Sequence, residues 1–270
     1  MKGKPEAFYA ELDRLFASGD SQAAESFLLA HGKLAAETDE QLYIMCMSEL
    51  GGLYRGSGKY GESVEAFEKA GGAIERMYGA HSANYATNLN NLAGTLRSMG
   101  ENARSLDLFE TAIKIMEETI GRDNYHYASA LNNVSLLYQS ERKFDDAMKA
   151  LTQSMEILEK LPDTEIEFAT AYSNMSLIYQ QTGKWDKARE AVGKSLGIFA
   201  RFPPNPHGAA ALNAQANVSI HEGNLEGARG CLEAAIALTR KFCAQSPEID
   251  AMTQALNDCR RGNGGEYEGD

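Results

Sequence analysis

The sequence has few cysteines, and their spacing is wrong for a covalent or metal-bound framework. The four cysteines, Cys46, Cys231, Cys243 and Cys259, include no Cys-x-x-Cys pair, and three of them lie after residue 230. A secreted disulfide scaffold or a structural zinc site needs closer, paired spacing. We therefore expect reduced, partly buried thiols and no metal.

Patterns that carry catalysis are also missing. The five histidines are scattered, and none belongs to a His-Glu-x-x-His motif. The glycine pairs 51–52 and 71–72 lie within helical apolar patterns and follow no strand, so they do not indicate a phosphate-binding loop. We expect a non-catalytic protein without a cofactor.

Positive charge is in deficit. The chain has 26 Lys and Arg against 38 Asp and Glu, a formal net charge of −12. Such a chain repels phosphate backbones and anionic membrane surfaces, which argues against nucleic acid and membranes as partners. No apolar run approaches the roughly 18 residues that cross a bilayer, and residues 1–6 lack the apolar region of a signal peptide. We predict a cytoplasmic location.

What the sequence does contain is a long repeat. The run Leu89-Asn90-Asn91-Leu92 returns 42 residues later as Leu131-Asn132-Asn133-Val134, and 41 residues after that as Tyr172-Ser173-Asn174-Met175. A fixed period of this length is typical of stacked helical or strand units. Apolar residues at three- and four-residue steps favour helices here.

Each repeat predicts two antiparallel helices around a short turn. Small residues alternate with large ones, which lets two helices approach closely while the large side chains fill the grooves. The aligned turn residues are Gly58, Gly100, Arg142, Gly183 and Gly223; the small column after them is Ser63, Ser105, Ala147, Ala188 and Ala228; the large column is Phe67, Phe109, Leu151, Val192 and Leu232. Glycine supplies a left-handed conformation without steric cost, so Arg142 is the exception.

These columns resemble the tetratricopeptide repeat. Small residues stand at its eighth, twentieth and twenty-seventh positions, an aromatic at the eleventh and a large apolar residue at the twenty-fourth, but the period exceeds the usual length of about 34. The 40 to 42 residue variety, with a Leu-Asn-Asn-Leu-Ala run and a link such as Gly121-Arg122-Asp123, looks like the repeats of the kinesin light chain family.

The resemblance implies an all-α, right-handed superhelical solenoid of helix-turn-helix repeats. We predict a degenerate helical pair at 1–38 and tandem units over 39–243, at about 39–80, 81–122, 123–162, 163–202 and 203–243. A capping helix is expected at 244–261 and a disordered tail at 262–270. The last unit is degenerate, because polar Gln215 and Ser219 replace apolar residues.

In such a stack the first helices line a concave groove that binds a peptide segment or a protein partner. The candidate binding residues are the column Asn91, Asn133 and Asn174, its neighbours Asn90 and Asn132, and, near the groove edge, Arg55, Arg97, Gln139 and Gln180. Each amide offers a donor and an acceptor to an extended peptide backbone. The alternative is that the asparagines tie adjacent first helices together and bind nothing.

A complete carboxylate clamp is not supported, because Thr87, Ser129 and Thr170 occupy the second groove position, where such clamps carry lysine or arginine. Arg55 and Arg97 could still hold an acidic side chain through charge-assisted hydrogen bonds, or be ordinary solvated arginines.

Three functions remain open from the sequence. The first is a scaffold that binds a peptide or protein in its groove. The second is a regulatory module that senses a small signalling peptide and changes its grip on an effector. The third is a solenoid that associates with itself as a homo-oligomer.

Overall fold

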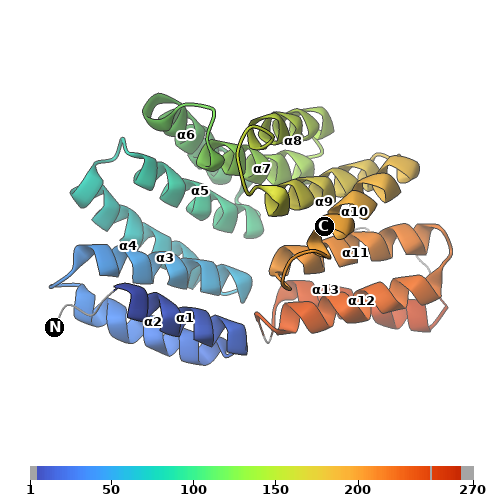
Figure 1. The fold of residues 1–270 in the computed structure, drawn as a ribbon, viewed down its shortest axis with the longest axis horizontal. Coiled ribbons are helices and arrows are strands. Elements are labelled where there is room, and N and C mark those ends of the chain that lie inside the picture. Colours follow the sequence, from blue (N-terminus) through green and yellow to red (C-terminus); the bar gives the residue numbers. More distant parts are fainter. Residues whose placement is uncertain (1–4, 244, 263–270) are drawn as a thin grey trace. The chain divides into compact units, whose positions relative to one another are not determined.

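The structure, a computed structural model, describes residues 5–243 and 245–262, which form thirteen α-helices and no strand (Figure 1). The all-α prediction is thus confirmed. The predicted tail, apart from Gly262, lies outside the described residues. The helices are α1 (Pro5–Ser18), α2 (Ser21–Ala35), α3 (Glu40–Gly56), α4 (Tyr60–Tyr78), α5 (Ala83–Ser98), α6 (Asn102–Ile120), α7 (Tyr125–Ser140), α8 (Phe144–Leu158), α9 (Glu165–Gln181), α10 (Trp185–Phe199), α11 (Pro206–His221), α12 (Leu225–Arg240) and α13 (Pro247–Arg260).

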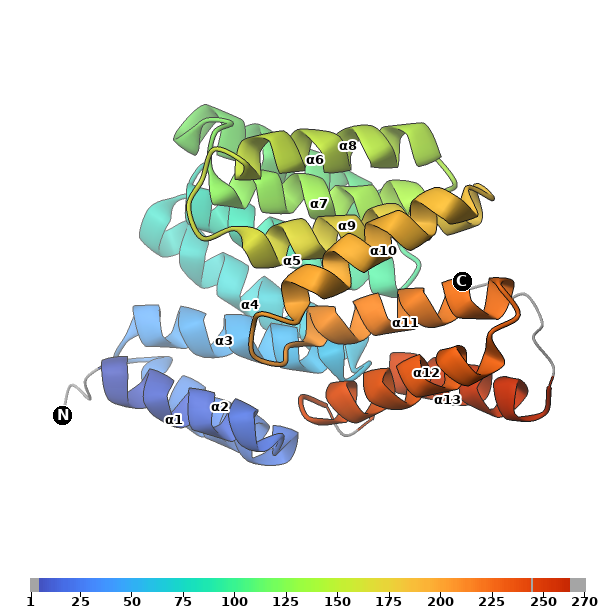
Figure 2. The same cartoon turned by 45° about the vertical axis from the view of Figure 1, so that its right-hand side comes forward.

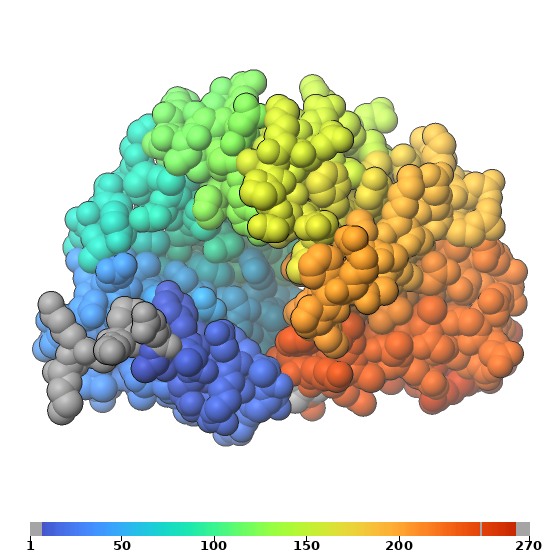
Figure 3. Space-filling model, in the orientation of Figure 1, coloured from blue at the N-terminus to red at the C-terminus, as the bar shows by residue number. Residues whose placement is uncertain are grey.

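The helices group into two compact units, α1–α6 and α7–α13. In the second unit the first helices of successive pairs are in contact, α7 with α9 and α9 with α11 (Figure 2). In the first unit α3 contacts α5 in the same way. Side chains fill the spaces that the ribbons leave between neighbouring helices of a unit (Figure 3). Each unit therefore offers a row of adjacent first helices.

Most of the first helices begin at a capping side chain. Asp39 accepts from the backbone N–H of Leu42, and Ser82, Asn124 and Asn205 do the same for α5, α7 and α11. Such a cap satisfies one of the free N–H groups at a helix start and is worth about 1 kcal/mol. The second helices α4, α8 and α10 instead follow lysines without a side-chain cap. The links between pairs therefore define where each pair begins.

The turn within each pair has one conformation, including where glycine is absent. Gly58, Gly100, Gly183 and Gly223 have φ between 69° and 79°, and Arg142 has φ 59°. The residue after each of them donates its backbone N–H to the carbonyl five residues earlier, as Lys143 does to Tyr138 at 2.8 Å. The exceptional residue thus takes the same left-handed conformation, which costs a side-chain-bearing residue about 1–2 kcal/mol.

The small columns bring the two helices of a pair into backbone contact. The hydroxyl of Ser63 donates to the carbonyl of Gly51 at 2.7 Å, and Ser105 donates to Ala93 at 2.8 Å. In α9 the serine is on the other helix, and Ser176 donates to the carbonyl of Ala188 at 2.9 Å. A serine can therefore replace alanine in either helix, because the facing carbonyl satisfies its hydroxyl.

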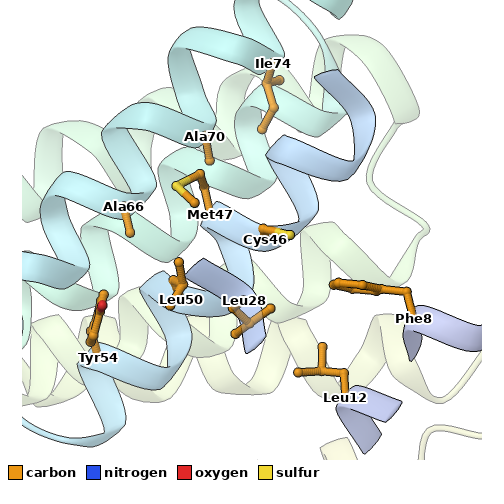
Figure 4. Close-up of a cluster of buried hydrophobic side chains, with 10 residues drawn as sticks. All are labelled: Phe8, Leu12, Leu28, Cys46, Met47, Leu50, Tyr54, Ala66, Ala70 and Ile74. Atoms are coloured by element: carbon orange, nitrogen blue, oxygen red, sulfur yellow. The ribbon is translucent and has the colours of Figure 1, made fainter. Parts of the chain in front are cut away.

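The core follows the large columns. Phe109, Leu151, Val192 and Leu232 are fully buried, and Phe67 is 1% exposed. Helices α3 and α4 share a cluster with α1 and α2, formed by Phe8, Leu12, Leu28, Cys46, Met47, Leu50, Tyr54, Ala66, Ala70 and Ile74 (Figure 4). At the other end α13 packs one apolar face, Ile249, Met252, Leu256 and Cys259, in a cluster with residues of α11 and α12. In the described part of the chain, no helix combines the length and the apolar character needed to span a membrane.

Candidate functional site

All nine residues predicted for binding lie on first helices, four of them in the first unit and five in the second, and we call the set in each unit its polar face. None is fully exposed: Asn90, Asn174 and Gln139 are buried, and the other six are half-buried. Their helices are α3 for Arg55, α5 for Asn90, Asn91 and Arg97, α7 for Asn132, Asn133 and Gln139, and α9 for Asn174 and Gln180. The polar face is therefore held within the packing of neighbouring helices.

One amide pair links two first helices directly. The Nδ2 atom of Asn174 donates to Oδ1 of Asn132 at 3.1 Å, which joins α9 to α7. An amide group has two N–H donors and an oxygen that accepts twice, so this bond uses only part of the capacity of either residue. The bond fits the helix-tying interpretation of Asn174, and it also fixes the orientation of Asn132, which stays half-exposed to solvent.

A second link repeats in both units. The Nη1 atom of Arg55 donates to the backbone carbonyl of Asn91 at 3.2 Å, and Nε2 of Gln180 donates to the carbonyl of Ala214 at 3.0 Å. Arg55 and Gln180 occupy the same repeat position, and so do the two acceptors. A long polar side chain near the end of one first helix thus reaches the middle of the next.

The residue that faces this link varies with the side chain that makes it. At Gly94, an added Cβ atom would lie 2.9 Å from Nη1 of Arg55. In the three following repeats the equivalent position is occupied by Leu136, Leu177 and Asn217. The Nδ2 atom of Asn217 donates to Oε1 of Gln180 at 3.4 Å. The large guanidinium is therefore accommodated by a glycine, and the shorter glutamine by an asparagine that bonds to it.

Gln139 makes a related link to the next first helix. Its Nε2 atom donates to Oε1 of Gln181 on α9 at 3.0 Å. The sequence had suggested Gln139 and Gln180 as groove-edge binding groups, and the structure gives each of them a partner within the protein.

The guanidinium of Arg55 has an unusual electrostatic environment. Burial lowers the pKa of Arg55, and the positive charge of Arg97 lowers it further. None of the ion pairs among the described residues includes Arg55. A charge without a counter-ion in such a position is destabilised by the loss of water. Arg55 is therefore not an ordinary solvated surface arginine.

One residue at the position of the asparagine column is not an asparagine and cannot be recognised by residue type. Glu49 precedes Asn91 by 42 residues and holds the same position on α3. Burial, with a smaller contribution from Asp13, raises the pKa of Glu49. Glu49 can be found by extending the repeat alignment one unit toward the N-terminus, but not by searching for a recurring asparagine.

Three buried polar atoms have no hydrogen-bond partner among the described residues: Asn88 Oδ1, Ser173 Oγ and Asn217 Oδ1. Asn88 lies beside Gly71 and donates its Nδ2 to the carbonyl of Phe67 at 3.0 Å. Ser173 is next to Asn174 in the chain and 3% exposed. Its unsatisfied hydroxyl is therefore buried beside the polar face and is not part of the surface.

Within residues 5–243 and 245–262, no three His, Cys, Asp or Glu side chains are grouped to hold a metal ion. His221 stacks on Trp185 with ring centroids 3.8 Å apart, and His31 packs against Phe8 and Phe27. The arrangement can donate and accept hydrogen bonds, which is what binding requires.

Comparison with known families settles the class of repeat. The model of the tetratricopeptide repeat matches residues 43–118, 84–160 and 167–241. These ranges cover most of the chain. The chain belongs to the tetratricopeptide repeat family. The resemblance noted in the sequence columns is thus confirmed, with the helix pairs that it implies.

Solved structures of tetratricopeptide-like proteins share the fold. NprR in complex with its cognate peptide NprX is 16% identical, with a TM-score of 0.72 over 99% of this chain and 77% of that one. A Rap protein complexed with Competence and Sporulation Factor is 12% identical, with a TM-score of 0.65 over 94% and 85%. The putative kinesin light chain repeats of Podosopora anserina are 19% identical, with a TM-score of 0.50 over 74% and 96%. At these identities the likeness establishes the fold. No curated protein sequence matches the chain.

Proposed function

We propose that the chain is a non-catalytic scaffold in which the polar faces of the units bind a peptide segment or a protein partner. The observation that carries the proposal is the set of buried and half-buried amides at equivalent positions of successive first helices, partly fixed by bonds such as that between Asn174 and Asn132. Membership of the tetratricopeptide repeat family supports it.

The chemistry of the face suits an extended peptide backbone. Such a backbone presents alternating N–H and C=O groups, and an amide side chain can pair with either. Side chains that are already held in one orientation lose less conformational entropy on binding. The Asn174–Asn132 bond leaves donors and acceptors unused, so tying the helices and binding a peptide are compatible.

A regulatory module that senses a small signalling peptide is the second candidate. NprR, solved in complex with its cognate peptide, and the Rap protein align with 99% and 94% of this chain. In this function the peptide would bind one arrangement of the helices better than another and so shift the grip on an effector. Self-association remains a third proposal, which size-exclusion chromatography with light scattering would test.

A peptide selected from a random display library against the immobilised protein tests the proposal. Asn91 is the cleanest position, because its side chain makes no hydrogen bond within the described structure. Asn91→Ala should change the free energy of unfolding by less than about 0.5 kcal/mol. It should lower the affinity for the peptide by about 2- to 12-fold, as expected for the loss of one hydrogen bond.

The combined variant of Asn91, Asn133 and Asn174 to alanine should abolish binding in isothermal titration. Asn174→Ala alone should cost about 1 kcal/mol of stability, because it removes the bond to Asn132. Gln153→Ala, on the second helix α8, is the control and should bind normally. Unchanged affinity of the triple variant, or no enriched peptide at all, would contradict the proposal.

A further inference from the structure

Two residues at one repeat position make the same kind of link between adjacent first helices but differ in charge. Arg55 donates to the carbonyl of Asn91 at 3.2 Å, and neutral Gln180 makes the equivalent bond to Ala214 at 3.0 Å. The link between adjacent first helices therefore does not require a positive charge. The charge at Arg55 needs another explanation.

Keeping this charge is costly to the free protein. Burial and the neighbouring Arg97 both oppose the cation at Arg55, and no carboxylate pairs with it in the described structure. A Cβ atom at Gly94 would come within 2.9 Å of Nη1, so the guanidinium would have to shift from its present position if residue 94 were not glycine. Glycine inside a helix costs about 1 kcal/mol relative to alanine. Two unfavourable features thus coincide at one point of the polar face.

We infer that Arg55 and Arg97 form a site for a carboxylate, the side chain of an aspartate or glutamate in the bound peptide. The inference rests on the proposed function and adds the chemistry of the ligand to it. A guanidinium has five N–H groups in a planar fork, of which Asn91 uses one, and the fork matches the two oxygens of a carboxylate. A carboxylate there would also supply the counter-ion that Arg55 does not have among the described residues.

The negative charges of the protein favour a peptide with a single acidic residue at this site over a highly acidic one. Glu49 lies six residues before Arg55 on α3, about 9 Å along the helix axis. The chain as a whole has a net charge of −12, which opposes the approach of a highly acidic segment. In the second unit the positions equivalent to Arg55 and Arg97 are Gln139 and Gln180, which give no reason to prefer an acid.

The test compares two peptides and two proteins by fluorescence polarisation. The peptides are one selected by display and its analogue with each Asp or Glu changed to Asn or Gln. The wild-type protein should prefer the acidic peptide by about tenfold or more, as charge-assisted hydrogen bonds allow, and the preference should shrink between about 0.05 and 0.5 M NaCl. The variant Arg55→Gln/Arg97→Gln should keep less than about a twofold preference.

Two features keep this experiment interpretable. Glutamine at position 55 can retain the link to Asn91, as Gln180 does to Ala214, so the variant should unfold at the same urea concentration as the wild type or a higher one. The control variant Arg76→Gln/Arg104→Gln changes the net charge equally at exposed arginines that pair with Glu40 and Glu101. It should keep the full preference for the acidic peptide.

The outcomes separate this inference from the proposed function. Equal binding of both peptides by the wild type, or equal loss of preference in the control variant, overturns the carboxylate site and leaves peptide binding standing. Failure to select any peptide overturns both. Loss of preference in the Arg55 and Arg97 variant alone supports the site.

Discussion

Gln180 offers the sharpest test of how adjacent first helices are held together. Its Nε2 atom donates to the carbonyl of Ala214 at 3.0 Å and to Oγ of Ser176 at 3.2 Å, and its Oε1 accepts from Asn217. Gln180→Leu removes all three contacts. It also leaves the Nδ2 group of Asn217 without its hydrogen-bond acceptor, and the Oδ1 atom of the same amide already has no partner among the described residues. A net hydrogen bond is worth about 1 kcal/mol and a stranded buried group costs about 1–3 kcal/mol, so we expect a loss of about 2–3 kcal/mol.

Removing the stranded group should recover much of this loss. Asn217→Leu alone should cost about 1 kcal/mol or less, since Gln180 keeps two of its contacts. Leucine is the natural choice, because Leu177 holds the equivalent position on α9. The double variant should therefore be more stable than the sum of the two single changes by about 1–2 kcal/mol.

Urea unfolding followed by tryptophan fluorescence measures this coupling. Trp185, the one tryptophan of the sequence, stacks on His221 of α11 and so reports on the second unit. The four free energies of unfolding form a double-mutant cycle. If the two changes add to within about 0.5 kcal/mol, the residues do not interact and the proposed link is refuted.

Three further predictions concern the core, the turn and the titration of Glu49. Phe109→Ala, at a fully buried ring, should cost about 3–5 kcal/mol and lower the melting temperature seen by circular dichroism; a change under about 1 kcal/mol would contradict the core assignment. Arg142→Gly should stabilise the protein by about 1 kcal/mol in urea, whereas Gly183→Ala, at φ 69°, should destabilise it by a similar amount; a destabilised glycine variant would argue against strain in the turn. Because the pKa of Glu49 is raised, the folded state holds the proton of this carboxyl group more tightly than the unfolded state, and the free energy of unfolding should fall as pH rises from about 4.5 through the folded-state pKa. The variant Glu49→Gln should lose this pH dependence and be more stable than the wild type at about pH 7 in urea titrations. An unaltered pH dependence would rule out Glu49 as its source.

The repeat register made most of the fold predictable from the sequence. A fixed period places equivalent residues in equivalent environments, so aligned columns show which positions are small, large or left-handed. Gly58 and Phe67 behave as their columns predict. Arg142 follows the conformation of its column although it is not glycine, because backbone hydrogen bonds close the turn. Local spacing was sufficient for these features.

The links across the polar face could not be predicted in the same way. A column compares residues at one position, whereas the bond of Arg55 joins one column to the backbone of another. Which columns meet depends on how adjacent helices cross and which rotamers the side chains adopt. Glu49 was missed for a different reason, because its residue type differs from that of its column. The repeat boundaries, the concave groove and the cytoplasmic location stay predictions.

Side-chain amide resonances of the ¹⁵N-labelled protein give the most direct test of the proposed binding surface. On addition of the selected peptide, the amide signals of Asn91, Asn132 and Asn174, assigned through their alanine variants, should shift together. The amide of Gln153 on α8 should not move. Shifts at Gln153 with unchanged signals from the three asparagines would show that the peptide binds elsewhere and that the polar face only holds the helices together.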